Sequence, residues 1–176
     1  GIWPLRAADG AVSHWHALML DVTREKEAER ALREAEERYR NLVEQLPAVV
    51  YVEGVTPVRY PNGRLDRPLL YVSPQVEELT GHPPEAHQRD RSLWVRAIHP
   101  DDYQRVRQET REAWATGRFH SEFRIVHRDG SVRWLESTAR LIRDADGKPV
   151  AWQGVMLDVT ERKRIEEELR VAEERY

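Results

Sequence analysis

The spacing of apolar residues changes twice along this chain of 176 residues. In the middle, apolar and polar residues alternate with a period of two, which is typical of strands with one buried face. Asp129-Gly130 and Asp146-Gly147 separate the last three of these stretches, so these three are predicted to form an antiparallel meander. The predicted strands are residues 48–54, 69–73, 119–128, 131–143 and 149–159.

The chain between the second and third strands has helical spacing instead. A first helix is predicted to begin at Ser73-Pro74, with Ser73 as N-cap, and to end at Gly81. The following predictions are an irregular stretch at 82–91, a short helix or turn at 92–99 and a longer helix at 99–117. Because only these helices can cover the sheet, the predicted fold class is α+β, with a pocket between the helices and one face of a five-stranded antiparallel sheet.

Two charged helical segments, residues 24–46 and 161–176, flank this domain. Apolar residues in the first follow alternating steps of four and three, which is the a/d spacing of a coiled coil. The seam of a parallel homodimer is the favoured interpretation, and a solvated helix with one apolar face packed on its own domain is the alternative. The seam positions are Ala28, Leu32, Ala35, Tyr39, Leu42 and Leu46 in the first segment and Ile165, Leu169, Ala172 and Tyr176 in the second.

The end of the chain repeats a segment near its beginning. Residues 19–39 and 156–176, which lie 137 positions apart, are identical at 14 of 21 positions. This interval suits one small domain and its connector, so the chain is expected to be part of a modular array. The predicted parts are 1–20, the last strands of a truncated preceding domain; 21–46, a helical linker; 47–160, a complete domain; and 161–176, an outgoing helix. Without the rest of their domain, residues 1–20 are expected to be disordered or to pair with a sheet edge.

Composition removes several classes of function. The net charge is −3 with both signs interspersed, so no nucleic-acid binding is predicted. No apolar run is long enough to cross a bilayer, and we expect a cytoplasmic segment without membrane contact. The absence of cysteine excludes disulfides, thiolate metal sites, cysteine nucleophiles and cysteinyl-flavin adducts.

Five stretches of the sequence, in this order and spacing, resemble a PAS domain of the bacterial multi-domain sensor type. They are YRNLVEQLPAVVYV (39–52), YVSPQVEELTGHPPE (71–85), LWVRAIHPDDYQRV (93–106), EFRIVHRDGSVRWLE (122–136) and GVMLDVTERKRIEEEL (154–169). The resemblance covers residues 40–161, and residues 1–20 resemble the end of a preceding PAS domain. It implies a PAS sheet covered by short helices, flanked by coiled-coil-type helices, within a tandem PAS array.

The resemblance also implies sensing, dimerisation and signal relay, without catalysis by the domain itself. Its partners would be neighbouring PAS domains and an output domain such as a histidine kinase or a diguanylate cyclase. In the family, an Asp-Val-Thr motif couples the last strand to the outgoing helix, which places this role on Asp158 and Thr160, and on Asp21 and Thr23 in the first copy. Plain N-capping by the two threonines is the simpler interpretation, and a ligand-free dimerisation spacer is the alternative function.

The aromatic and apolar side chains in the predicted pocket determine how much space is free for a ligand. The candidate pocket-lining residues are Tyr51, Trp94, Phe123, Ile125 and Met156. If they fill the interior, little space remains for a ligand. For the tryptophans, packing in the core and on the sheet faces is the favoured interpretation; the alternative is that Trp134 or Trp152, on the outer sheet face, packs against a flanking helix or a second protomer.

The cofactor stays open at this stage. No cofactor is the favoured interpretation, and noncovalent flavin and haem remain alternatives. Haem-binding PAS proteins usually place the iron ligand on the long helix, which has no histidine here between residues 101 and 116. His14 and His16 lie on one strand face without a third ligand nearby, so we predict neither a metal site nor a catalytic one.

Overall fold

The computed structural model describes residues 2–6, 8–17, 20–60, 63 and 65–174, without the side chains of residues 13 and 16. The chain divides into two compact units, residues 1–41 and 42–176, and each is described by itself. Within the described residues, none of the helices is both long and apolar enough to span a bilayer.

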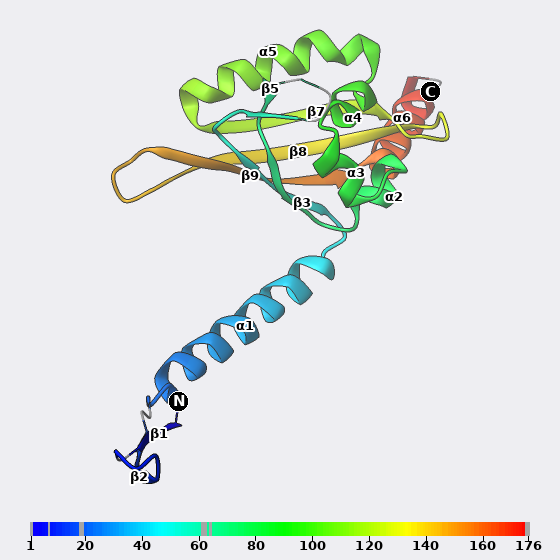
Figure 1. Ribbon diagram of the computed structural model, residues 1–176. Coiled ribbons are helices and arrows are strands. Elements are labelled where there is room, and N and C mark those ends of the chain that lie inside the picture. The colour runs from blue at the N-terminus through cyan, green and yellow to red at the C-terminus, as the bar shows by residue number, and fades with distance from the viewer. Residues whose placement is uncertain (1, 7, 18–19, 61–62, 64, 175–176) are drawn as a thin grey trace. The chain divides into compact units, whose positions relative to one another are not determined.

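The second unit contains a five-stranded antiparallel sheet in the order β6-β3-β9-β8-β7, which confirms the predicted fold class. The first and last strands of the domain, β3 and β9, therefore lie side by side at its centre (Figure 1). The strands are β3 (Val49–Gly54), β6 (Leu69–Val72), β7 (Arg118–Val126), β8 (Val132–Arg143) and β9 (Pro149–Asp158).

Helices cover one face of this sheet, and the longest of them lies along the sheet (Figure 1). They are α2 (Val76–Thr80), α3 (Pro84–Arg89), α4 (Ser92–Ala97) and α5 (Pro100–Thr116). Helix α5 ends at Gly117, whose φ of 68° is in the left-handed region that favours glycine. The core lies between the helices and the inward residues of the strands, including Val49, Leu69, Val76, Val106, Phe123, Ile125 and Leu135.

Three local predictions between residues 55 and 91 are wrong. The buried hydroxyl of Ser73 accepts a hydrogen bond from Val50 N at 2.9 Å, so it joins the sheet instead of capping a helix, and α2 begins later, after Gln75. The stretch predicted as irregular contains α3, which starts with Pro84 in the first turn, where proline is favoured. Residues 55–68, which are rich in proline and glycine and predicted to be a loop between the first two strands, contain a small ladder of β4 (Val58–Arg59) and β5 (Leu65–Asp66).

The first unit contains a hairpin of β1 (Ile2–Arg6) and β2 (Val12–Ala17), followed by helix α1 (Thr23–Glu44). The expectation that residues 1–20 are disordered or pair with another sheet edge is wrong for the described residues, because β1 and β2 pair with each other.

The register of this hairpin repeats that of β8 and β9. Ile2 pairs with Ala17 as Ala139 pairs with Gly154, and both ladders shift register at the corresponding arginine. That arginine donates to the glycine carbonyl of the turn at 2.9 Å in each case. The 137-residue repeat therefore extends to the hydrogen-bond pattern.

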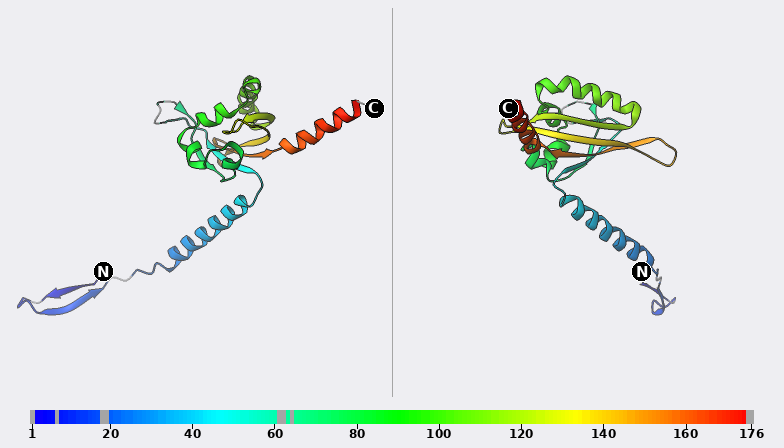
Figure 2. Two further views of the ribbon diagram at one scale, coloured as in Figure 1. Left: turned by 90° about the vertical axis from the view of Figure 1, so that its right-hand side faces the viewer. Right: turned by 180° about the vertical axis from the view of Figure 1, so that it is seen from behind.

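The last helix, α6 (Thr160–Glu174), begins two residues after the end of β9 and runs away from the sheet (Figure 2). No residue of α6 is buried, and the same holds for the described residues of α1. Both helices therefore expose their apolar positions in the single chain.

Candidate functional site

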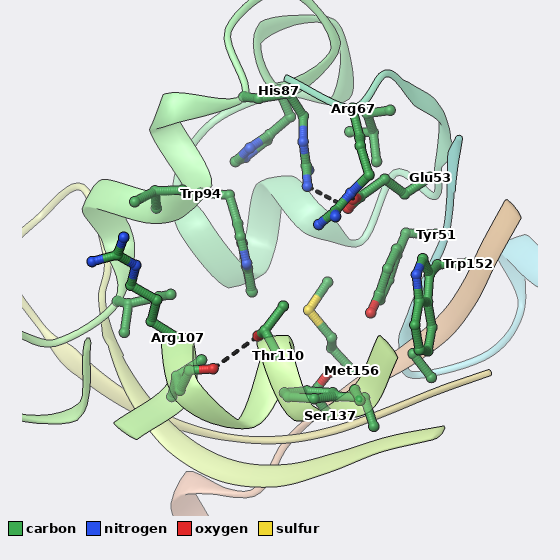
Figure 3. A pocket seen from close by; sticks show the side chains of 18 of the residues that line it. Tyr51, Glu53, Arg67, His87, Trp94, Arg107, Thr110, Ser137, Trp152 and Met156 are labelled. Carbon is green, nitrogen blue, oxygen red and sulfur yellow. Dashed lines mark hydrogen bonds and ion pairs between the residues drawn. The ribbon is translucent and has the colours of Figure 1, made fainter. Parts of the chain in front are cut away.

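A cavity of about 260 Å³ lies between the inner face of the sheet and the helices of the second unit. Tyr51, Trp94, Phe123 and Met156 are in its wall (Figure 3). Ile125 is not part of the cavity wall. It is fully buried in the core, where it forms an isolated antiparallel β-bridge with Ile98. The predicted aromatic residues line the interior without filling it.

Small residues keep this space open. Ala113, Ser137 and Ala139 contribute to the wall, and their side chains are short. Gly154 makes room in a different way, because a Cβ at this position would collide with the ring of Tyr51. The ring of Tyr51 can therefore lie flat over the central strand β9.

Two pairs of aromatic rings meet edge to face around the cavity. Trp94 packs on Phe123 with ring centroids 6.4 Å apart, and Trp114 packs on Trp152 with centroids 5.4 Å apart. Trp152 is buried in the cavity wall, which agrees with the favoured prediction of core packing and excludes the alternative position on the outer face for this residue. Trp134 does lie on the outer face, where Lys163 of α6 stands 5.6 Å from its ring centroid.

One end of the cavity is charged. The carboxylate of Glu53, which is buried, accepts from Arg67 Nε and from Arg91 Nη2, the latter at 2.6 Å. The guanidinium of Arg67 also stacks 4.9 Å from the ring centroid of Trp114. Figure 3 shows Glu53 and Arg67 at the end of the cavity away from Ser137. A single acidic residue at an inward position of β3 was the sequence signal for this cluster.

Two further polar groups of the wall, Tyr51 and His87, are uncharged. Burial raises the pKa of the Tyr51 hydroxyl to about 12, and the hydroxyl is hydrogen-bonded to Ser137. Burial lowers the pKa of His87 to about 4, with the positive charges of His82 and Arg91 adding to the shift. At neutral pH both side chains are therefore neutral.

The cavity does not suit either cofactor alternative. Its volume is below the range of about 300–1,000 Å³ of typical small-molecule and cofactor sites, and a three-ring flavin does not fit it in this state. The histidine of its wall, His87, has Nε2 2.9 Å from Thr80 Oγ1, so that nitrogen is engaged and not available to haem iron. Among the side chains that the structure describes, no cluster of three or more potential metal ligands forms, and the side chain of His16 lies outside that set.

The second candidate site is the joint between β9 and α6. Asp158 Oδ1 accepts hydrogen bonds from Thr160 N at 2.9 Å and from the Thr160 hydroxyl at 2.5 Å. The same hydroxyl accepts from Trp134 N at 2.9 Å, and Trp134 O accepts from Val159 N at 2.8 Å. Asp158 therefore serves as the acceptor at the start of α6, while Thr160 binds the helix to the backbone of β8.

Ion pairs on the outer face fix the first turn of α6 to the sheet. Glu122 of β7 accepts from Arg162 Nη2 at 2.6 Å and lies 2.5 Å from Lys163 Nζ. These two cations, Lys163 first, lower the pKa of Glu122 to about 2. No local pattern predicts this contact, because Glu122 and Lys163 are 41 positions apart.

The first copy of the motif has the same local turn. Asp21 Oδ1 accepts from Thr23 N at 3.0 Å, and bonds from the hydroxyl and the N–H of Thr23 lower the pKa of Asp21. The carboxylate is again the acceptor at the helix start, in place of the threonine.

The predicted seam of α1 is exposed in the single chain. The exposed fractions are 61% for Leu32, 70% for Tyr39 and 57% for Leu42; Ala28 is also exposed and Ala35 is half-buried. In α6, Ile165 and Leu169 are similarly exposed, and Tyr176 lies outside the described residues.

The end of α1 is held by a side chain of the PAS-like unit. Gln75 Nε2 donates to Glu44 O at 2.7 Å and to Leu46 O at 3.1 Å. These bonds satisfy a carbonyl at the helix end, which has no partner within the helix.

Comparison with known proteins relates the chain to sensors. A sequence profile of the PAS fold matches residues 69–156. The chain is 32% identical over 161 residues to the uncharacterized protein y4lL of Sinorhizobium fredii, covering 91% of this chain and 18% of that protein. It is 32% identical over 159 residues to the two-component sensor PprA of Pseudomonas aeruginosa, covering 90% of this chain and 16% of that protein.

Solved structures give the same relation. A sensory box histidine kinase/response regulator from Burkholderia thailandensis matches with a TM-score of 0.56 and 26% identity, over 78% of this chain and 96% of that one. The chain spans less than a fifth of the length of either curated relative.

Proposed function

The chain belongs to the PAS fold family, and we propose that its complete domain, residues 47–160, senses a small molecule and relays the change through α6 to an output domain. Relatives of similar sequence are sensors of signal-transduction systems. The domain would act by changing conformation, without catalysing a reaction. A histidine kinase or a diguanylate cyclase is the proposed output of the longer protein.

The observation that carries this proposal is the course of strand β9. Trp152 and Met156 on this strand are in the cavity wall, and Asp158 at its end accepts the first hydrogen bond of α6. A ligand that displaces either inner side chain would shift β9 against β8. Because Thr160 is bonded to the backbone of Trp134 in β8, such a shift would change the angle at which α6 leaves the sheet.

We further propose that the domain works as a parallel homodimer through its flanking helices. Support comes from the a/d spacing of α1 and from the exposure of its apolar positions in the single chain. Replacing Leu32 and Leu42 with serine should abolish association, and sedimentation velocity would measure it. A dimer that persists in this variant would contradict the seam.

The preceding hairpin fits the proposal of a tandem array. Strands β1 and β2 have the register of β8 and β9, which supports residues 1–20 as the last strands of a preceding PAS domain, followed by a linker at 21–46. Residues 161–176 would form the outgoing helix. The cytoplasmic location and the lack of membrane contact expected from the sequence stay predictions.

A functional test requires the full-length protein with its output domain. Replacing Asp158 or Thr160 with alanine should make output insensitive to the signal, while circular dichroism shows a near-native fold. Asp146 in the exposed β8–β9 turn provides a matched control, and its replacement should leave regulation intact. Unchanged regulation in both the Asp158 and Thr160 variants would contradict the relay proposal.

The alternative function, a dimerisation spacer without a ligand, predicts an interior filled by side chains. A cavity of about 260 Å³ with a buried ion pair at one end favours the sensory function instead. Native mass spectrometry of the purified protein separates the two, because a sensor should retain or take up a small molecule and a spacer should not.

A further inference from the structure

We propose that the cavity binds a one- or two-ring aromatic carboxylate, whose acid group is held by Arg91 beside the buried Glu53 ion pair. This inference rests on the proposed sensory function and names the chemical class of its ligand. Its argument uses the charge, the unpaired donor, the aromatic wall and the volume of the cavity.

The wall of the cavity has an excess of positive charge. It contains three arginines against two carboxylates, since His87 is neutral. These residues are Arg67, Arg91, Arg107, Glu53 and Asp66. A net charge of +1 in a partly buried site favours a monoanion over a neutral or cationic ligand.

Arg91 offers the donor for such an anion. Its side chain is 16% exposed, and its Nη2 binds Glu53. Its Nε is buried and has no hydrogen-bond acceptor in the described part of the chain. A buried donor without an acceptor is unfavourable, and a charged acceptor forms the strongest bond with a guanidinium. A ligand carboxylate beside Nε would satisfy this donor.

The neighbouring Glu53 limits the charge of the ligand. It shares both arginines with the incoming acid, so a dianion such as a phosphate monoester would meet stronger repulsion than a carboxylate does. A neutral amide in the same place would pair with the donor but would not compensate the excess charge. The geometry therefore favours a single carboxylate.

The rest of the wall is suited to a flat apolar ring. Figure 3 shows Trp94 and Tyr51 on opposite sides of the cavity, with Met156 between them. The Tyr51 hydroxyl stays protonated because burial raises its pKa to about 12, so no negative charge develops at the end away from Arg91. Rings and a thioether favour edge and face contacts with an aromatic ligand.

The volume limits the size of the ligand. At the packing density of about 0.75 found in protein interiors, a cavity of about 260 Å³ holds about 200 Å³ of ligand. A phenyl or indole ring with a short acid chain is within this limit. Phenylacetate and indole-3-acetate are therefore suitable probes.

The test is isothermal titration calorimetry on the full chain with these two acids and their amides, phenylacetamide and indole-3-acetamide. We expect at least one acid to bind about tenfold or more tightly than its amide. Arg91→Gln should remove this preference, whereas Arg96→Gln should preserve it, because Arg96 is 61% exposed on α4 and outside the cavity wall. Equal affinity for acid and amide, or no binding of any of the four compounds, would overturn the proposal.

A second variant covers the case in which Arg91→Gln does not fold. Glu53→Gln leaves both arginines free of their internal carboxylate, so the acid should bind several-fold more tightly while affinity for the amide stays unchanged. Weaker acid binding in this variant would overturn the ligand class. Such a result would leave the relay proposal standing, because the Asp158 and Thr160 variants test relay through the output and not through binding.

Discussion

The two copies of the Asp-Val-Thr motif have the same sequence and different surroundings. In both, an aspartate accepts the N–H of the threonine two residues later, at 3.0 Å for Asp21 and 2.9 Å for Asp158. In the second copy the threonine hydroxyl also binds the backbone of β8. This difference between Thr23 and Thr160 indicates that the motif determines the local turn, whereas coupling of the helix to a sheet requires partners elsewhere in the sequence.

Those partners belong to β8, which pairs with β9, and to β7, the edge strand beyond β8. Trp134 provides the backbone N–H and a ring beneath Lys163, and Glu122 provides the carboxylate that holds the first turn of α6. For Thr23, the described bonds are the local ones with Asp21. The first joint of this chain is therefore an internal control for the second. Four substitutions test the difference between the two joints.

The largest effect is expected from removing the support beneath the second joint. Leu135 is fully buried and pairs with Asp158 in the ladder between β8 and β9. Leu135→Ala should lower the free energy of unfolding by about 2–5 kcal/mol, because it leaves a cavity in the core. Urea unfolding followed by tryptophan fluorescence measures this loss. Amide exchange in α6 should rise with it, whereas exchange in α1 should not change.

The next effect separates the two threonines. Thr160→Val removes the acceptor of the Trp134 N–H and should lower the free energy of unfolding by about 1–2 kcal/mol. The same change at Thr23 should alter the free energy of unfolding by no more than about 0.5 kcal/mol, as is usual for exposed positions. Equal losses in the two variants would show that the hydroxyl bond to β8 contributes nothing.

A smaller effect is expected at the ion pairs of the joint. Glu122→Gln should lower the free energy of unfolding by about 0.5–1 kcal/mol, because the carboxylate is 30% exposed and solvent partly screens the ion pairs. Glu166→Gln, within α6, is the control that leaves the contact between helix and sheet intact.

The same carboxylate makes the joint dependent on pH. The pKa of Glu122 is about 2 in the folded chain, against an ordinary value of 4.5. Because the folded pKa is depressed, its contribution is complete above about pH 4.5 and is lost as the pH falls toward about 2. The stability difference between wild type and Glu122→Gln should therefore shrink across this window. A stability difference between the two proteins that stays constant down to pH 2 would contradict the assignment of this pH dependence to Glu122.

The smallest effect is expected at the first joint. Asp21→Ala removes the acceptor of Thr23 N–H and should speed amide exchange only in the first turn of α1. The urea midpoint should stay the same, because this joint lies outside the folded sheet. A clear shift of the midpoint would mean that the first joint is coupled to the domain.

Much of the fold could be predicted because its signals are local. The Asp-Gly turns at 129–130 and 146–147 determine the meander, and Gly117 ends α5 as expected. Ser73 was assigned wrongly because its preference for a helix cap is local, whereas its actual partner, Val50, lies 23 positions away. The face of Trp152 stayed open between two interpretations because β9 is apolar on both faces, so alternation does not distinguish the inner face from the outer one.

The candidate sites were less predictable than the fold. Four of the five proposed pocket residues line the cavity because buried aromatic residues on inward positions gather there. The charged end was missed because Glu53 finds its arginines 14 and 38 positions away, in segments that look like solvated loops. The aspartates and threonines of the two joints were predicted from the Asp-Val-Thr motif of the family that the sequence resembles. Their partners Trp134 and Glu122 were not predicted, because the sheet brings them to the joint from distant positions in the sequence.

Amide exchange at two matched lysines tests the central claim most directly. Lys26 N donates to Val22 O at 3.0 Å, and Lys163 N donates to Val159 O at 2.9 Å, so each makes the first hydrogen bond of its helix. In dilute, monomeric protein, Lys163 should exchange about tenfold or more slowly than Lys26, and Thr160→Val should remove most of that protection. Equal exchange of the two amides in the wild-type chain would contradict the claim that the sheet, and not the motif alone, holds the outgoing helix.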